Sequence, residues 1–304
     1  MIAVFTRNMC RLAYFFRSNR SMMRECDALA DSEDSVLLPA DDTRFENLPR
    51  SIIGQDDRRQ IGDISLKPYR WICQLLVSGR AIPSGQFLAG TGFVVDQQHI
   101  VTAAHNLVTN NRLADIARIF VGVHGDRSDA KFGVYESRTF DVHPRYLRPR
   151  SSSDRTTYDL AVMRLDSPLP AGLMAGRFPF GKMPIKEVSL PSLNGYVAFV
   201  SGYPKDYPDH DRNRFPTPAL GVQAFQYSCQ SSLSVDGRML RYPLDTTGGQ
   251  SGSPIVGIQM SPSGRRESVA IGVHIEGDPR FGNVGVPFDT ERFNFVINSI
   301  SSLA

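Results

Sequence analysis

The sequence has few cysteines, no long hydrophobic run and little net charge. Four Cys in 304 residues are too few for a disulfide scaffold. No run of about 18 apolar residues occurs, so we expect no membrane-spanning helix. With 34 basic and 31 acidic residues, the formal net charge of +3 is too small to indicate a nucleic-acid partner. Because no CxxC or H-x-x-x-H pair is present, we expect no zinc site, and we assign no metal and no cofactor. Acidic pairs such as Asp56–Asp57 leave calcium dependence open.

The first fifty residues have a charge pattern of their own. Residues 1–24 contain five Arg and no acidic residue, whereas residues 25–46 contain eight acidic residues and one Arg. Three of the Arg interrupt the apolar clusters, so the segment lacks the unbroken apolar stretch of a standard signal peptide. We interpret residues 1–50 as a leader or pro-segment that is removed, and residues 51–304 as the functional domain.

Short apolar segments dominate the chain after residue 50. Each is about five to nine residues long, is rich in β-branched or aromatic residues and is bounded by turn formers, which is typical of strands. Their spacing favours an all-β barrel or sandwich over alternating strands and helices. The segments include YRWICQLLV, FLAGTGFVV, ARIFVGV, DLAVMRL, GYVAFVSG, SGSPIVGI and SVAIGVHI.

One helix is predicted near the end of the chain. Asp289 and Thr290 can cap the segment 291–300, because short polar side chains accept hydrogen bonds from the first N–H groups of a helix. Helical spacing places four apolar residues on one face, which we expect to be buried. These are Phe293, Val296, Ile297 and Ile300.

Three residues at the ends of apolar strands form a candidate catalytic set. His105 ends IVTAAH, Asp159 opens DLAVMRL, and Ser251 lies in the glycine-rich TTGGQSGSP. A serine nucleophile needs a base to take its proton and an acid to orient that base. It also needs backbone N–H groups for the oxyanion, which Gly249 and Ser251 can supply.

The order of these residues along the chain separates the possible enzyme classes. An α/β-hydrolase runs Ser, acid, His, and a subtilisin-like enzyme runs Asp, His, Ser, whereas this chain runs His, Asp, Ser. Position 253 is Ser, so the G-x-S-x-G elbow of the hydrolases is also missing.

The segments TGFVV, VTAAH, DLAVMRL, VSGYP, DTTGGQSGSP and AIGVH resemble the chymotrypsin-like serine proteases, and within them the bacterial glutamyl endopeptidase (V8-like) branch. The resemblance covers residues 51–304. It implies two six-stranded Greek-key β-barrels with the active site between them, followed by a C-terminal helix. It also implies a secreted, monomeric serine endopeptidase with His105 as base, Asp159 as orienting acid and Ser251 as nucleophile.

The same resemblance suggests how the enzyme is activated. SIIGQDDRRQI after NLPR is similar to the start of mature glutamyl endopeptidases, so we expect an activating protease to cut the Arg50–Ser51 bond of a zymogen. In this branch the new α-amine helps bind an acidic P1 side chain of the peptide substrate. His274 and Thr246 correspond to the other carboxylate contacts. Gln250 is neutral, so it cannot form the ion pair with the new amine that activates digestive proteases.

Several alternatives remain open at the level of sequence. Asp245 stands six residues before Ser251, where trypsin-like enzymes place the Asp that binds a basic P1 residue. Glu276 is an acid where the V8-like branch carries aromatic or small residues, and it could repel an acidic P1 side chain. A protease with basic or other narrow specificity, a catalytically silent binding module, and a quality-control protease of the HtrA type are the alternatives. Cys73 and Cys229 could form a disulfide or remain two buried thiols.

Overall fold

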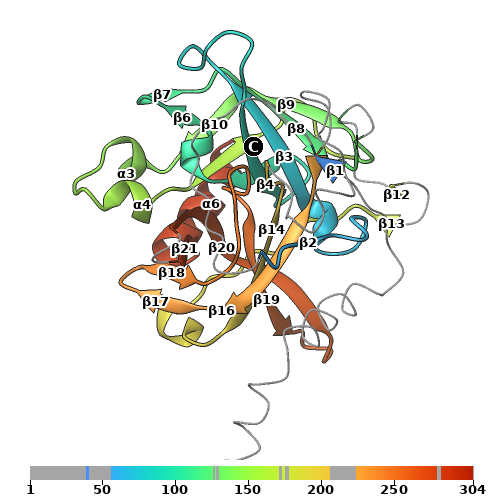
Figure 1. Cartoon of the computed structure of the whole chain (residues 1–304), viewed down its shortest axis with the longest axis vertical. Coiled ribbons are helices and arrows are strands. Elements are labelled where there is room, and N and C mark those ends of the chain that lie inside the picture. Colours follow the sequence, from blue (N-terminus) through green and yellow to red (C-terminus); the bar gives the residue numbers. More distant parts are fainter. Residues whose placement is uncertain are drawn as a thin grey trace, which may run out of the picture.

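The computed structural model describes residues 56–125, 127, 130–170, 173–174, 178–205, 224–278 and 282–303, together with a two-residue strand at 39–40. Two large antiparallel sheets organise this part of the chain, and they occupy the upper and lower halves of Figure 1. Arg50, Ser51 and the proposed cleavage site between them lie outside the described residues.

The first sheet contains seven strands in the order β10-β11-β5-β4-β3-β8-β9. These are β3 (Ile72–Ser78), β4 (Leu88–Val94), β5 (His99–Thr102), β8 (Ile116–Val121), β9 (Val134–Ser137), β10 (Thr139–Val142) and β11 (Ala161–Arg164). The two end strands, β9 and β10, are consecutive in the chain and separated by Arg138 alone. One bent strand therefore pairs with β8 at its start and with β11 at its end, which closes the sheet into a six-stranded barrel.

The second sheet closes in the same way. Its order is β17-β18-β21-β20-β19-β14-β16-β2. The strands are β14 (Val197–Gly202), β16 (Tyr227–Ser232), β17 (Ser234–Asp236), β18 (Met239–Tyr242), β19 (Pro254–Met260), β20 (Arg266–Asp278), β21 (Gly282–Pro287) and β2 (Arg59–Gln60). Only Leu233 separates β16, which pairs with β14, from β17, which pairs with β18. Counting the bent strand once gives six strands, to which β2 is added as an edge. The all-β fold class and its C-terminal helix are thus confirmed.

The remaining elements are short. Strand β1 (Pro39–Ala40) pairs with β15 (Ala224–Phe225), β6 (Val108–Thr109) with β7 (Arg112–Leu113), and β12 (Leu173–Met174) with β13 (Phe178–Pro179). The short helices are η2 (Tyr69–Trp71), η3 (Ala104–Asn106), α3 (Pro144–Leu147), α4 (Asp154–Thr157) and η5 (Leu190–Leu193). None of the helices in the described part of the chain has the length and apolar character needed to cross a membrane.

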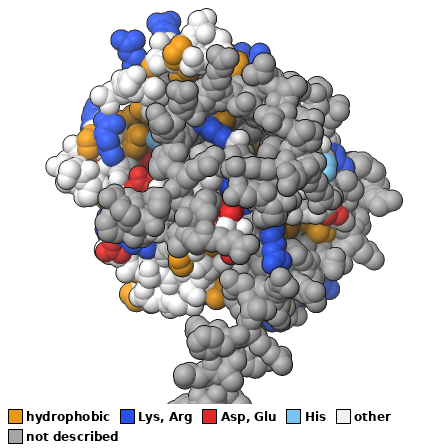
Figure 2. Space-filling model, in the orientation of Figure 1, with side chains coloured by type: hydrophobic (Ala, Val, Ile, Leu, Met, Phe, Trp, Pro, Cys, Tyr) orange, Lys and Arg blue, Asp and Glu red, His pale blue; other side chains and the backbone are white. Residues whose placement is uncertain are grey.

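The hydrophobic core continues from one barrel into the other. One cluster of buried residues fills the first barrel and also includes Phe199, Val256 and Val273 from strands of the second. A second cluster, which includes Val200, Leu240 and Ile255, fills the rest of the second barrel. Packing of buried residues across the interface therefore joins the two barrels into one unit. On the surface, the described part of the face in Figure 2 carries basic and acidic side chains interspersed with apolar ones.

Helix α6 (Thr290–Ser302) begins where the sequence predicted, with Asp289 accepting a hydrogen bond from the Arg292 N–H at its N-cap. Val296 is fully buried, but Ile297 is 39% exposed, so its predicted burial is wrong. Phe293 and Ile300 pack against the core as predicted. The buried face also includes the Arg292 guanidinium, which is held inside by hydrogen bonds to Asp289 and to backbone carbonyls. Phe295 packs on the core in place of Ile297. The helix ends among the strands of the first barrel (Figure 1), where Ser299 donates to Asp141 at 2.7 Å.

Both cysteines that lie in strands are free thiols. Cys73 is buried in β3 and Cys229 in β16, in different sheets. Burial raises the pKa of both thiols above the ordinary value. Cys229 donates a hydrogen bond to Asp57 at 2.7 Å. The structure therefore resolves the open choice in favour of two buried thiols.

Asp289 is expected to stabilise the fold at neutral pH and to lose this contribution as the pH falls. Burial opposes ionisation of this carboxyl, but hydrogen bonds from Arg292 and Arg238 hold its pKa well below the ordinary value of 3.8. A depressed folded-state pKa contributes stability that is complete above the unfolded value and is lost as the pH falls through the folded value. We expect Asp289→Asn to lower the free energy of unfolding by about 2 kcal/mol at pH 7. The difference should shrink below about pH 4.

Urea unfolding at pH 7, 5 and 3 measures this effect. Asp236→Asn is the matched control, because Asp236 pairs with Arg241 but is 62% exposed, and such surface pairs contribute little. A loss in Asp289→Asn that is as large at pH 3 as at pH 7 would contradict the assignment.

Candidate functional site

His105 lies in η3, immediately after strand β5. Thr102 ends that strand and donates its hydroxyl to the carbonyl of Thr91 at 2.7 Å. The amide of Asn106 donates to the Thr102 hydroxyl at 3.0 Å and to the carbonyl of Ser251 at 2.8 Å. The small residues Ala103 and Ala104 are fully buried, which allows the chain to turn tightly there. These contacts fix the turn that carries His105.

Asp159 lies between α4 and β11 and holds His105 through two hydrogen bonds. Its Oδ1 accepts from the backbone N–H of His105 at 2.9 Å, and its Oδ2 lies 2.6 Å from the ring Nδ1. Burial works to lower the pKa of His105, but the charge and hydrogen bond of Asp159, with the charge of Glu276, raise it above its ordinary value. With Nδ1 facing a carboxylate, the remaining ring nitrogen Nε2 is the atom able to take a proton.

Ser251 lies in a loop whose carbonyls are held by hydrogen bonds within the loop and from the neighbouring chain. Five consecutive carbonyls, those of residues 247–251, each accept at least one hydrogen bond. The donors are Gln250 N–H to Thr247 (3.1 Å), Lys205 N–H to Gly248 (2.8 Å), Thr91 Oγ1 to Gly249 (2.8 Å), Ser253 N–H and Oγ to Gln250 (3.0 and 2.6 Å), and Thr91 N–H to Ser251 (2.9 Å). In a trans peptide the N–H points opposite the preceding carbonyl. The N–H groups of Gly249 and Ser251 therefore point away from these donors.

The two N–H groups form a candidate anion site. Within the described residues, neither the Gly249 N–H nor the Ser251 N–H has an acceptor. Gly249 adopts a φ of +97°, and a Cβ there would lie 2.5 Å from the carbonyl oxygen of Tyr203. Only glycine fits both the dihedral and the close approach. The loop thus presents two unpaired donors next to a serine hydroxyl, which is the arrangement that stabilises an oxyanion.

The hydroxyl of Ser251 currently bonds to a backbone carbonyl. Its Oγ donates to the carbonyl of Ile275 at 3.1 Å. Rotation about the Cα–Cβ bond is a low-barrier motion between staggered positions, and it would release the hydroxyl from this carbonyl. Catalytic hydrogen bonds are often long or misaligned without substrate, so this rotamer is compatible with a nucleophilic role.

The predicted residues open into one pocket of about 300 Å³. It brings together His105, Asp159 and Ser251 with Thr246 and His274. The rest of its lining is Tyr146, Arg155, Thr156, Thr247, Gly248, Ile275, Glu276 and Gly277. Ser51, the other predicted substrate contact, lies outside the described residues.

His274 is held from behind by a tyrosine that the sequence analysis missed. The Tyr242 hydroxyl lies 2.9 Å from His274 Nδ1, and the His274 residue is only 2% exposed. Burial lowers the pKa of His274 to about 3, and the charge of His105 acts in the same direction. Thr246 is equally buried and donates its hydroxyl to Asn283. The pairing of β18, β21 and β20 brings these residues together, so no sequence spacing could have revealed the contacts.

Asp245 does not line the pocket in the described residues. Its Oδ2 accepts a hydrogen bond from the backbone N–H of Asp57 at 2.8 Å. The buried Arg58 next to it donates to the Thr247 hydroxyl at 2.8 Å. The segment that follows the predicted cleavage site is thus bound to the wall of the pocket. No group of His, Cys, Asp and Glu side chains able to hold a metal ion occurs among the described residues.

Comparisons with known proteins agree with this geometry. The sequence profile of the trypsin-like peptidase domain matches residues 90–260. The chain is 27% identical to glutamyl endopeptidase of Bacillus licheniformis over 231 residues, which cover 75% of this chain and 61% of that protein. It is also 27% identical to a Bacillus subtilis protein named extracellular metalloprotease over 248 residues, 81% of this chain and 68% of that protein.

Two solved structures share the fold. A Glu endopeptidase in complex with MPD superposes with a TM-score of 0.61 at 22% identity, covering 82% of this chain and 98% of that one. The protease Anisep from Arthrobacter nicotinovorans superposes with a TM-score of 0.54 at 16% identity, covering 78% and 97%.

The first prediction from the site concerns Gly249. We expect Gly249→Ala to lower hydrolysis and fluorophosphonate labelling of Ser251 by about 100-fold, because the new Cβ would displace an oxyanion donor. Gly264→Ala is the matched control: its φ is +76°, and a Cβ there has no neighbour within 4 Å. The control should lose about 1 kcal/mol of stability and keep its rate. Equal loss of rate in both variants would refute the oxyanion role.

The second prediction concerns the charge of Glu276. His105 must be neutral to accept a proton, so kcat/KM should rise through a pKa above 6.5. Burial, Asp159 and Glu276 set this pKa, and His274 is a further titratable group that interacts with His105. We expect Glu276→Gln to move the acid limb of the kcat/KM profile to lower pH, because removal of a nearby negative charge lowers the pKa of the imidazolium.

Glu267→Gln is the control for this measurement. Glu267 is an exposed residue of the same strand, about 30 Å from Glu276 along β20. It should leave the profile unchanged. A Glu276→Gln profile that does not move, or moves to higher pH, would show that this charge does not act on His105.

Proposed function

Because the chain belongs to the trypsin-like peptidase domain family, we propose that it is a serine endopeptidase that cleaves peptide bonds through an acyl-enzyme. One observation carries the proposal above the others. A histidine bound to a carboxylate lines the same pocket as a serine whose loop has two N–H groups without an acceptor among the described residues. The chain spans 61% of the length of the glutamyl endopeptidase it matches, so its activity is inferred from its own site.

The proposed reaction begins when a peptide carbonyl enters the pocket. Ser251 Oγ turns from the Ile275 carbonyl, loses its proton to His105 Nε2 and attacks the carbonyl carbon. The Gly249 and Ser251 N–H groups bind the oxyanion. His105 then gives the proton to the departing amine, while Asp159 stabilises the imidazolium. A water molecule, deprotonated by the same His105, releases the second product and restores the serine.

We infer that the P1 pocket prefers Glu or Asp. If the Tyr242 hydroxyl donates to His274 Nδ1, the ring carries its proton on Nε2 and can donate it to a carboxylate. Thr246 lies beside it in the pocket. The low pKa of His274 means that the empty pocket is uncharged at this residue, so the cation for an acidic side chain must come from elsewhere. The α-amine of Ser51 is that cation in our proposal.

The position of residues 56–58 supports the zymogen part of the proposal. Asp57 and Arg58 are tied to Asp245 and Thr247, and Thr247 lines the pocket. Ser51 stands six residues before Asp57, a span of up to about 20 Å, which is enough to reach the pocket from there. Cleavage at Arg50–Ser51 would therefore create the amine close to where it is needed. We further propose that the enzyme is secreted and monomeric.

A P1 scan tests the proposal. The chain that begins at Ser51 should cleave substrates with Glu at P1 faster than those with Asp, Arg or Phe, measured as kcat/KM. His274→Gln should reduce cleavage after Glu more than cleavage after Phe, since only the carboxylate uses the imidazole donor.

Three other results would change the conclusion. Arg substrates cleaved at least as fast as Glu substrates would remove the roles of His274 and Thr246 but leave the endopeptidase. Cleavage after Glu that is equal with and without the Arg50–Ser51 cut would remove the role of the Ser51 amine. No hydrolysis and no fluorophosphonate labelling of Ser251 after the cut would identify a binding module.

A further inference from the structure

The carboxylate of Asp159 is oriented by a single residue. Within the described part of the chain, both hydrogen bonds it accepts come from His105, one from the backbone and one from the ring. Among the described residues, no second residue donates a hydrogen bond to this carboxylate. The position of Asp159 therefore depends on the backbone on its two sides. Leu160 and strand β11 follow it, and Thr157 and Tyr158 at the end of α4 precede it.

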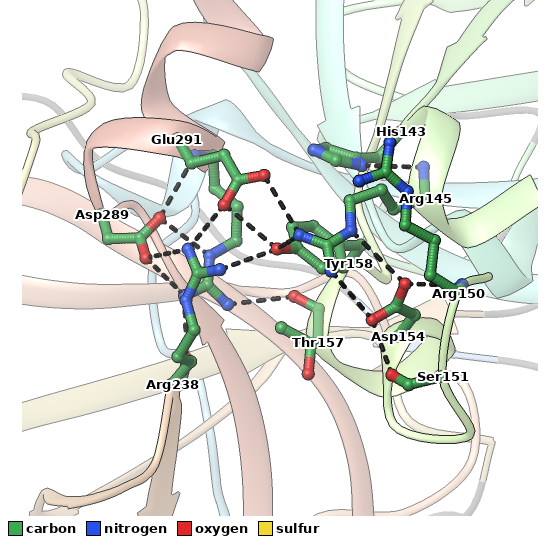
Figure 3. Close-up of polar contacts among 11 residues, drawn as sticks. His143, Arg145, Arg150, Ser151, Asp154, Thr157, Tyr158, Arg238, Asp289 and Glu291 are labelled. Atoms are coloured by element: carbon green, nitrogen blue, oxygen red, sulfur yellow. Dashed lines mark hydrogen bonds and ion pairs between the residues drawn. The ribbon is translucent and has the colours of Figure 1, made fainter. Parts of the chain in front are cut away.

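That backbone is held by a group of charged side chains around Tyr158, which we call the Tyr158 cluster. Figure 3 shows Tyr158 between Asp289 and Glu291 on one side and Arg145 on the other. The cluster consists of Tyr158, Arg145, Arg238, Asp289, Glu291 and Arg292. It joins three parts of the molecule: the α3–α4 segment, the turn between β17 and β18, and the start of α6.

Tyr158 is the centre of this cluster. Its residue is 1% exposed, and its hydroxyl donates to Glu291 Oε2 at 3.0 Å while accepting from Arg238 Nη1 at 2.7 Å and from Arg145. The Arg145 guanidinium lies 4.1 Å from the centre of the ring, and His143 stacks at 4.5 Å between ring centroids. A buried hydroxyl with three charged partners, next in sequence to Asp159, has little freedom to move.

Arg292 fixes the residue on the other side of Tyr158. It is fully buried and uses all five of its N–H donors. The acceptors are both carboxylate oxygens of Asp289 (2.9 and 2.7 Å), the carbonyls of Thr157 (2.9 Å) and Arg238 (2.9 Å), and the Met239 sulfur (3.8 Å). The bond to Thr157 lies two residues before Asp159. The backbone leading to the carboxylate is thus anchored to α6 and to the second barrel.

We propose that Tyr158, supported by Arg292, is a positioning residue for Asp159: the cluster sets the carboxylate against the His105 ring by tying its backbone to the second barrel and α6. This role rests on the proposed function, because it concerns the orientation of the catalytic base. It does not depend on the P1 preference, since the cluster does not line the pocket among the described residues.

Tyr158→Phe is the test, because it keeps the ring and removes the hydroxyl that bonds Glu291, Arg238 and Arg145. We expect kcat to fall roughly tenfold with KM nearly unchanged, because orientation of the base matters in the transition state and not in substrate binding. Tyr135→Phe is the matched control. Its hydroxyl bonds to the Phe132 carbonyl at 3.0 Å within the first barrel, far from any predicted catalytic residue in sequence.

A second measurement does not require activity. The charge of Asp159 helps to raise the pKa of His105, and Glu276 and His274 are the other titratable groups that face the ring. If Asp159 moves, NMR titration of His105 should give a lower pKa in Tyr158→Phe and the wild-type value in Tyr135→Phe. Glu291→Ala, whose side chain is 42% exposed, removes one partner of the hydroxyl with less risk to the fold and should shift both readouts in the same direction.

The outcomes separate this inference from the proposed function. If Tyr158→Phe and Glu291→Ala lower the melting temperature but leave kcat and the His105 titration as in the wild type, the cluster is structural only and the inference is wrong. If the wild-type protein is not labelled by fluorophosphonate, the proposed function fails, and the His105 titration alone decides whether Tyr158 positions Asp159.

Discussion

The hydrogen bonds of Thr91 and Asn106 to residues 249–251 are the constraint on which the site depends. His105 and Asp159 belong to the first barrel, and Ser251 belongs to the second, so no single sheet positions the whole set. Thr91 holds the carbonyls of Gly249 and Ser251, and Asn106 adds a second donor to the latter. All three bonds run from the first barrel to the second. They fix the serine relative to the histidine, and the Gly249 and Ser251 N–H groups have no acceptor among the described residues.

The strand ends, the serine loop and the start of the C-terminal helix were predictable from the sequence, because local patterns determine them. Strand ends, the glycine-rich loop and the N-cap at Asp289 depend on neighbours within a few residues, and the structure has them where the patterns indicated. The chain order His, Asp, Ser excluded the α/β-hydrolase and subtilisin-like classes, and the resemblance of the surrounding segments then indicated the fold. Placement of His105, Asp159 and Ser251 in one pocket agrees with that selection.

The remainder depends on contacts between residues that are distant in the chain. The alternation of apolar and polar residues does not reveal that a bent strand closes each barrel. The strand changes its pairing partner at Arg138 in the first barrel and at Leu233 in the second, and the sequence pattern does not mark either change. Of the four apolar residues predicted on one face of α6, only Ile297 does not pack against the core, because a hydrophobic pattern takes no account of a buried arginine whose five donors all find acceptors. The contact between Tyr242 and His274 was not predicted for a similar reason, since it forms only when β18, β21 and β20 pair.

The charges around the pocket bear on two parts of the proposal: the protonation of His105 and His274, and the binding of an acidic side chain by the α-amine of Ser51. Glu276 helps His105 toward protonation, and His274 is kept neutral by burial and by the same His105. An acidic substrate side chain would enter a pocket whose wall carries Arg155 and one exposed acid, Glu276, and whose buried imidazole is uncharged. An unpaired charge in a largely buried site is unstable, so the substrate carboxylate would be stabilised either by a second proton on His274 or by a cation placed beside it. A free amine produced only by cleavage would satisfy that requirement, and the same cut would then control both maturation and specificity.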